Sequence, residues 1–108
     1  MQLPALYHWS PADRHDTIRE NGLVPGSPNH VATAPQPHIC LCPTPSSAWG
    51  LSGGVDLVDC DAWDLWQVRL APADEVHIPD MWGNQLREVN VRNQIPADRL
   101  WWIARRTC

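Results

Sequence analysis

Lysine and phenylalanine are absent from this chain of 108 residues, and tyrosine occurs only once. All eight basic residues are therefore arginines, and seven tryptophans supply nearly all of the aromatic side chains. Lysine and phenylalanine have AT-rich codons, so their absence indicates a GC-rich coding genome. This bias describes the source of the chain and leaves its function open.

Positive charge is also scarce, because the formal net charge of the chain is −4. A general nucleic-acid surface normally requires a basic stripe, so the charge argues against one. It leaves open the binding of a single small nucleotide, which needs only a few local hydrogen-bond donors.

The sequence also lacks long apolar runs, and none approaches the length of a membrane-spanning helix. Residues 1–4 do not have the basic start of a signal peptide. We therefore expect a cytoplasmic protein with no membrane partner. The hydrophobic share of 44% and the charged share of 19% are typical of a globular chain, and the length suits one domain over residues 1–108.

Two of the four cysteines lie close together in the sequence. Only one residue separates Cys40 from Cys42, whereas zinc-binding cysteines usually have two to four residues between them. With His38 they form His-x-Cys-x-Cys, which would place all three side chains on one face of a strand. A metal site on these three residues is therefore an alternative. We favour buried free thiols in a reducing cytosol, and assign no metal ligands.

Apolar alternation and turn residues predict about six short strands and one or two helices. We expect a first strand over residues 3–9 and a helix over residues 11–21, with Ser10 as its N-cap and Gly22 as its C-cap. The other expected elements are strands at 38–42, 65–70, 76–78, 86–91 and 101–104, a short helix after Thr44, a strand or loop at 55–60, and loops at 24–37 and 80–85. The pattern predicts an α+β fold with a small, split, mostly antiparallel sheet.

Glu88 is one of only three glutamates and lies within the predicted strand 86–91. Glutamate is depleted in strands, so its presence there calls for an explanation. Strand alternation places Glu88 and Asn90 on one face and Val89 and Val91 on the other. If the two valines face the core, Glu88 points away from it, toward either a cleft or bulk solvent.

Several short motifs occur in a characteristic order along the chain: Tyr7-His8-Trp9-Ser10, Gly22-Leu23-Val24-Pro25, Ile39-Cys40-Leu41-Cys42, residues 44–49, Arg87-Glu88-Val89-Asn90-Val91 and Ile95-Pro96-Ala97-Asp98. This order resembles the ADP-ribosyltransferase superfamily, the NAD-cleaving group that includes diphtheria-type toxins, poly(ADP-ribose) polymerases, DarT-like DNA modifiers and RNA 2′-phosphotransferases. Many compact members begin with a Tyr-His strand, a helix and a Gly-Leu-x-Pro turn. They place a catalytic acid in a late strand before an Ile-Pro turn. The resemblance implies an ADP-ribosyltransferase-like fold.

The resemblance also implies roles for individual residues. His8 matches the first-strand histidine that hydrogen-bonds the ribose of NAD, and Ser10 is close enough in sequence to contact the same ligand. Glu88 matches the acid that accepts a hydrogen bond from the ribose 2′-OH and stabilises an oxocarbenium-like transition state. His8 and Glu88 are therefore the expected catalytic residues, and NAD is the expected ligand, as substrate.

Some features depart from the family pattern. The tyrosine that stacks on nicotinamide has no counterpart, because Tyr7 is the only tyrosine. Trp49 or Trp82 is expected to provide the stacking surface instead. Leu86, two residues before the acid, disfavours arginine as the acceptor of ADP-ribose.

We therefore expect an NAD-dependent ADP-ribosyltransferase or NAD glycohydrolase that releases nicotinamide and passes ADP-ribose to a protein, a nucleic acid or water. The alternative is a catalytically inactive module of the same fold that binds a nucleotide or acts as an inhibitor, in a phage or toxin–immunity context. Trp101 and Trp102 cannot both point inward from one strand, so one is exposed or covered by a partner, which leaves room for a homodimer.

Overall fold

The structure of the chain is a computed structural model, and it describes residues 5–25, 38–52, 62–78 and 88–107. Within these residues it contains six strands, two α-helices and two short 3₁₀ helices. The elements are β1 (Ala5–Pro11), a 3₁₀ helix (Ala12–Arg14), α1 (His15–Asn21), β2 (Ile39–Leu41), α2 (Pro45–Ser52), β3 (Ala62–Arg69), β4 (Val76–His77), β5 (Val89–Val91), a second 3₁₀ helix (Ala97–Arg99) and β6 (Leu100–Thr107). The predicted α+β class is confirmed.

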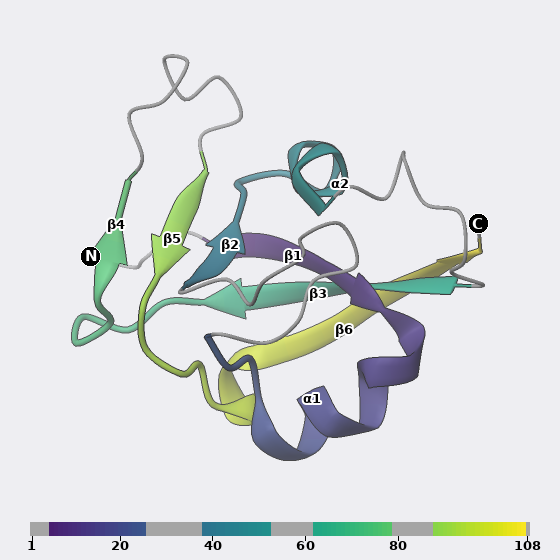
Figure 1. Cartoon of the computed structure of the whole chain (residues 1–108), viewed down its shortest axis with the longest axis horizontal. Coiled ribbons are helices and arrows are strands. Elements are labelled where there is room, and N and C mark those ends of the chain that lie inside the picture. The colour runs from purple at the N-terminus through teal and green to yellow at the C-terminus, as the bar shows by residue number, and fades with distance from the viewer. Residues whose placement is uncertain (1–4, 26–37, 53–61, 79–87, 108) are drawn as a thin grey trace.

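The strands form two antiparallel sheets of three strands each (Figure 1). One sheet has the order β1-β3-β6 and the other has the order β2-β5-β4. An isolated bridge joins them: the Tyr7 N–H donates to the Cys42 carbonyl over 2.7 Å, and the Cys42 N–H donates to the Tyr7 carbonyl over 3.1 Å. The sheet is therefore split between β1 and β2, as predicted.

The predicted start of the first helix is wrong. Ser10 does not cap a helix, because β1 continues through Ser10 and Pro11, where they pair with Asp64 and Trp63 of β3. A 3₁₀ turn follows, and α1 begins only at His15. The N-cap signal was local, whereas pairing with β3 depends on residues more than fifty positions away.

The predicted end of this helix is confirmed at Gly22. Its φ of 76° lies in the left-handed region, and its N–H donates to the Ile18 carbonyl over 2.8 Å. A Cβ at this position would collide with the carbonyl oxygen of Ile95. Glycine is therefore required both by the backbone conformation and by the close approach of the segment after β5.

The other predicted elements are found with shifted ends. Thr44 caps α2, since its hydroxyl accepts a hydrogen bond from the Ser47 N–H over 3.1 Å. The predicted strands 65–70 and 101–104 lie largely within the longer β3 and β6. The predictions for residues 55–60 and 80–85, and for most of 24–37, fall outside the described residues.

The hydrophobic core lies between the two sheets and α1. Its buried members are Leu6, Ile18, Leu23, Ile39, Leu41, Trp66, Val68, Val91, Ile95 and Leu100. The second sheet contributes Ile39, Leu41 and Val91, which alternate with Cys40 and Asn90 along β2 and β5. Val91 belongs to the core and Val89 packs against the core, which meets the condition under which Glu88 points away from it.

The two helices cover opposite faces of the β1-β3-β6 sheet (Figure 1). On one face, the His15 ring of α1 lies 5.1 Å from the ring of Trp66. On the other face, the Trp49 ring of α2 lies 5.0 Å from Trp9 and 5.6 Å from Trp63. The first sheet is therefore packed on both sides.

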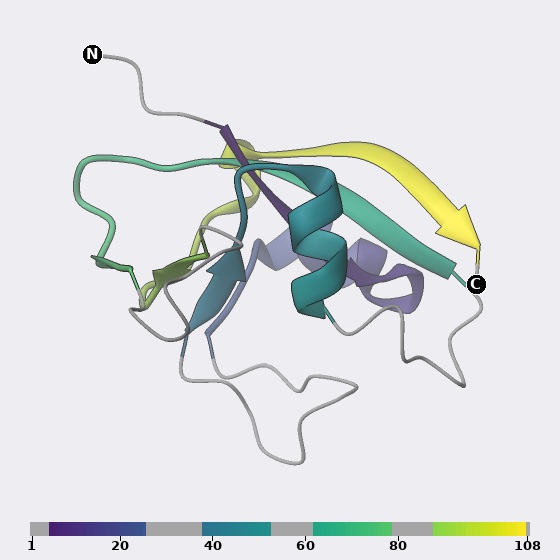
Figure 2. The ribbon, with the colours of Figure 1, turned by 90° about the horizontal axis from the view of Figure 1, so that it is seen from above.

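Strand β6 runs along the outer edge of this sheet (Figure 2). An irregularity between Leu65 and Trp66 of β3 shifts the register, and both Trp101 and Trp102 are half-exposed, at 44% and 47%. We expected one of the pair to be exposed or covered by a partner, and within this chain both are half-exposed. None of the helices in the described part of the chain has the length and apolarity needed to cross a lipid bilayer.

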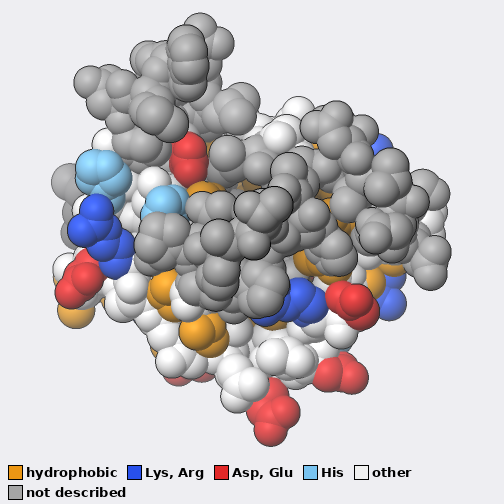
Figure 3. Space-filling model, in the orientation of Figure 1, with side chains coloured by type: hydrophobic (Ala, Val, Ile, Leu, Met, Phe, Trp, Pro, Cys, Tyr) orange, Lys and Arg blue, Asp and Glu red, His pale blue; other side chains and the backbone are white. Residues whose placement is uncertain are grey.

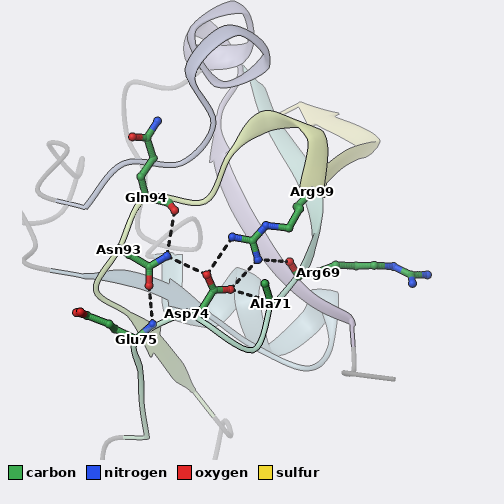
Figure 4. A network of polar contacts seen from close by, with 7 residues as sticks. All are labelled: Arg69, Ala71, Asp74, Glu75, Asn93, Gln94 and Arg99. Carbon is green, nitrogen blue, oxygen red and sulfur yellow. Dashed lines mark hydrogen bonds and ion pairs between the residues drawn. The ribbon is translucent and has the colours of Figure 1, made fainter. Parts of the chain in front are cut away.

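A closed polar network ties the β3–β4 turn to the segment between β5 and β6 (Figure 4). The Arg99 guanidinium makes two bonds to the Asp74 carboxylate, at 2.7 and 2.9 Å, and also donates to the Arg69 carbonyl over 3.1 Å. The Ala71 N–H and the Asn93 amide donate to Asp74 over 2.7 and 2.9 Å. We call these residues the Asp74 network.

Candidate functional site

His8 lies where the two sheets separate. After the Tyr7–Cys42 bridge, continued pairing would bring the Trp9 N–H to the Cys40 carbonyl, because hydrogen-bonded pairs recur every two residues in an antiparallel ladder. Instead the His8 side chain reaches this carbonyl, with Nδ1 3.0 Å from the Cys40 oxygen. A carbonyl oxygen only accepts hydrogen bonds, so Nδ1 carries the proton.

The environment of His8 keeps its imidazole neutral. Burial lowers the pKa of His8 below 6.5, and the positive charge of Arg14 lowers it further, while the bond to Cys40 opposes the change. In a neutral ring with a protonated Nδ1, the Nε2 atom has a free lone pair. This atom can therefore accept a hydrogen bond from a ligand hydroxyl.

Ser10 lies on the same face of β1 as His8, two residues further along the strand. Its side chain is buried, with 4% of the residue exposed, opposite the buried Asp64 of β3. The structure therefore places two of the predicted ligand contacts, His8 and Ser10, on one strand face.

Glu88 immediately precedes β5 and reaches the side chain of Cys40 on β2. The Cys40 thiol is hydrogen-bonded to the Glu88 carboxylate. Burial, this hydrogen bond and the negative charge of Glu88 raise the pKa of Cys40 to about 12. Burial and Glu88 also raise the pKa of Cys42 to about 11. Both thiols are therefore protonated at neutral pH and poorly nucleophilic.

His8 and Glu88 thus meet different parts of one residue of β2. His8 contacts the Cys40 carbonyl from the β1 side, and Glu88 contacts the Cys40 thiol from the β5 side. Alternation places Glu88 on the sheet face that carries the side chains of Cys40 and Asn90, and places His8 with Leu6 on the face of the core. The two expected catalytic residues are therefore brought to one strand of the split.

His38 joins this group from the residue before β2. One ligand atom each of His38, Cys40 and Glu88 lie within 4.8 Å of one another, and all three residues are half-buried. The sequence had pointed to His38, Cys40 and Cys42 as an alternative metal set. In the group that the structure assembles, Glu88 takes the place of Cys42, because the pairing of β5 with β2 brings the residue before β5 close to Cys40.

Asn90 lies directly opposite Cys40 in this ladder and on the same face. The residue is 5% exposed, and its Oδ1 is buried with no hydrogen-bond partner among the described residues. A buried carbonyl-type oxygen without a donor is costly, since most such groups in folded proteins are satisfied. Histidine and acidic side chains also surface together over the sheet formed by β4, β5 and β2 (Figure 3).

The two tryptophans predicted as stacking residues have different outcomes. Trp49 packs on α2 against Trp9 and Trp63, and the Arg106 guanidinium lies 4.1 Å from the centre of its ring. Its ring is therefore engaged within the protein. Trp82 lies outside the described residues.

A second polar cluster was not foreseen from the sequence. Asp64 is fully buried on β3, with His15 Nδ1 2.7 Å away and two bonds from Arg105, at 2.7 and 3.1 Å. Although burial raises the pKa of Asp64, hydrogen bonds from Arg105, His15 and Trp102 lower it overall. The only sequence signal was an aspartate within the apolar run Trp63-Asp64-Leu65-Trp66, because His15 and Arg105 are distant in sequence.

Comparison with known proteins adds no relative. No protein-family model, curated protein or solved structure matches the chain. Functional conclusions therefore rest on the residues themselves and on their geometry.

Proposed function

We propose that this chain is an ADP-ribosyltransferase-like domain that binds NAD and cleaves its nicotinamide–ribose bond. The observation that carries the proposal is that His8 and Glu88, eighty positions apart, both contact Cys40 at the split between the sheets, His8 at its carbonyl and Glu88 at its thiol. The motif order in the sequence supports the same assignment, and so does the observed arrangement of two antiparallel sheets with two helices.

His8 binds the ribose in this proposal. Its Nδ1–H is committed to the Cys40 carbonyl, which fixes the ring orientation and leaves Nε2 as an acceptor. Because burial holds the ring neutral, Nε2 accepts a hydrogen bond from a ribose hydroxyl. Ser10 on the same strand face offers a further hydroxyl to the ligand.

Glu88 stabilises the positive charge that develops as the bond breaks. The bonding electron pair leaves with nicotinamide, which departs neutral and needs little acid catalysis, while C1′ of the ribose becomes oxocarbenium-like. The Glu88 carboxylate accepts the ribose 2′-OH hydrogen bond and stabilises this charge. Water or an acceptor nucleophile then bonds to C1′ and loses its proton to solvent.

The acceptor of ADP-ribose is a protein, a nucleic acid or water in this proposal. Stacking on nicotinamide is assigned to Trp82, because the ring of Trp49 is held by Arg106 and its tryptophan neighbours.

Release of nicotinamide from NAD, measured with purified protein, tests the proposal. Wild type should release nicotinamide, and Glu88→Gln should reduce the rate by about 100-fold or more, because the transition-state charge loses its carboxylate. Glu20→Gln is the matched control: it makes the same chemical change on the exposed side of α1 and should leave the rate unchanged.

Two outcomes would contradict catalysis. Equal rates for wild type and Glu88→Gln would remove the acid from the mechanism. If NAD raises the melting temperature of the protein without release of nicotinamide, the inactive nucleotide-binding module is the better description. In that case His8→Ala should abolish the shift in melting temperature.

A further inference from the structure

We propose that His38, Cys40 and Glu88 form a binding site for a divalent transition metal, with Zn²⁺ as the best match. Cys40 lies in β2, His38 directly precedes β2 and Glu88 directly precedes β5, and their ligand atoms already lie within 4.8 Å of one another. The evidence for this metal site does not depend on NAD cleavage. Both proposals nevertheless use the Glu88 carboxylate.

The mixture of donor atoms indicates the class of metal. An imidazole nitrogen, a thiolate sulfur and a carboxylate oxygen are the three ligand types of protein-bound zinc, whereas Mg²⁺ and Ca²⁺ prefer oxygen alone. The thiolate excludes the hard cations most strongly. Zn²⁺ also accepts such a mixed set of ligands, because its filled d shell imposes no preferred geometry.

The spacing is close to what tetrahedral zinc requires. Bonds of about 2.0–2.3 Å place neighbouring ligand atoms roughly 3.3–3.8 Å apart. The observed limit of 4.8 Å is therefore about 1 Å too wide, which side-chain rotation of half-buried residues can close. His38 and Glu88 each lie one residue outside the ladder that joins β2 to β5, so all three residues are already close neighbours.

A fourth ligand position is also provided for. Three protein ligands leave one tetrahedral position for water, the arrangement found in catalytic rather than structural zinc sites. Asn90 lies opposite Cys40 on the same face, and its buried Oδ1 has no hydrogen-bond partner among the described residues. We assign this oxygen to accept a hydrogen bond from the metal-bound water, which satisfies it.

Metal binding replaces a proton in this site. Without metal, the Cys40 thiol donates its proton to the Glu88 carboxylate, so the two groups are already held together. When Zn²⁺ binds, the thiol proton passes to solvent, the sulfur coordinates as thiolate, and the carboxylate turns from the thiol to the metal. No electrons are transferred in this step.

Titration of the metal-free protein with Co²⁺, followed by displacement with Zn²⁺, tests the site. Co²⁺ bound tetrahedrally by thiolate gives a sulfur-to-metal charge-transfer band and intense visible bands. One equivalent of Co²⁺ should bind with these bands, and one equivalent of Zn²⁺ should abolish them. Cys40→Ser should remove the charge-transfer band, and His38→Gln and Glu88→Gln should each weaken binding by more than about 100-fold.

His77→Gln is the matched control, because His77 is an exposed histidine on the neighbouring strand β4 and lies outside the group. It should leave both affinity and spectrum unchanged. Absence of the charge-transfer band in folded wild type would overturn the proposal, and so would an unchanged spectrum in Cys40→Ser. His38→Gln separates the two proposals, since it removes metal binding and leaves the residues assigned to NAD cleavage intact.

Discussion

Two carboxylates in this protein lie in opposite kinds of surroundings. Asp74 is held by the Arg99 guanidinium, the Ala71 N–H and the Asn93 amide, and these partners lower its pKa to about 2. Glu88 is half-buried and bonded to a thiol, a weak donor, beside His38. The Asp74 carboxylate accepts four hydrogen bonds from the chain, whereas beside Glu88 the buried Asn90 Oδ1 has no hydrogen-bond partner among the described residues.

We infer from this difference a structural role for Asp74, and we propose a binding role for the group around Glu88. A carboxylate whose partners are all supplied by the chain contributes to stability and has little to offer a ligand. A carboxylate beside unused donor and acceptor atoms contributes less to stability, and the chain gains from a ligand that completes its coordination. Substitutions in the Asp74 network should therefore lower the stability of the protein. Substitutions around Glu88 should instead remove ligand binding and change the stability little.

The largest effect is expected from Asp74→Ala. The substitution leaves the Arg99 guanidinium, which is only 22% exposed, without its ion pair. We expect a loss of about 3–5 kcal/mol in the free energy of unfolding, measured by urea denaturation. Asp98→Ala, at an exposed neighbour of Arg99, is the control and should change it by less than about 0.5 kcal/mol. Similar values for the two variants would remove Asp74 from the role assigned to it.

Acid should weaken the Asp74 network next. The folded-state pKa of Asp74, about 2, is lower than its ordinary value of 3.8, so the stabilisation is complete above about pH 5 and is lost as the pH falls toward 2. The loss amounts to about 2 kcal/mol. Wild type should therefore lose about this much more stability than Asp74→Asn between pH 5 and pH 2. Parallel stability curves for the two proteins would contradict the shift.

A smaller effect is expected from Asn93→Ala. The Asn93 side chain accepts from the Glu75 N–H over 2.6 Å and donates to Asp74, and the Arg99 pair survives its removal. The Asn93 amide also donates to the Gln94 carbonyl over 3.0 Å, so three partly solvated hydrogen bonds are lost, and we expect destabilisation by about 1 kcal/mol. Asp74→Ala combined with Asn93→Ala should cost less than the sum of the two, since both act on one network. Strict additivity in this double-mutant cycle would mean that the contacts are independent.

The smallest change in stability is expected from Glu88→Gln. The half-buried carboxylate is bonded to a thiol, and glutamine keeps an acceptor oxygen there, so the free energy of unfolding should change by less than about 1 kcal/mol. The same variant should lose metal binding and NAD cleavage. A destabilisation as large as that of Asp74→Ala would place Glu88 among the structural carboxylates and end the contrast.

Much of the fold followed from local patterns in the sequence. The cap at Thr44, the helix end at Gly22 and the alternation of Trp66 and Val68 were all correctly located because each depends on neighbours within a few residues. The error at Ser10 shows the limit: a good N-cap was overridden by pairing with Asp64, which no local pattern reports.

The site was predictable in its members but not in its grouping. Glu88 was named as an unusual acid in a predicted strand, and His8 was named from the family resemblance. His38 and Cys40 were named from their His-x-Cys-x-Cys spacing. Replacement of Cys42 by Glu88 in the metal set depends on the register between β2 and β5, which is fixed only in the folded chain. The clusters around Asp64 and Asp74 depend on the same kind of distant pairing.

The bond from His8 to Cys40 places an evolutionary constraint on position 8. The ring supplies the donor that a backbone N–H of Trp9 would provide if β1 and β2 continued to pair, so the opening between the sheets is itself maintained by this side chain. A replacement that keeps this bond must be an uncharged side chain that donates to the Cys40 carbonyl, as asparagine and glutamine can. We therefore expect narrow natural variation at position 8.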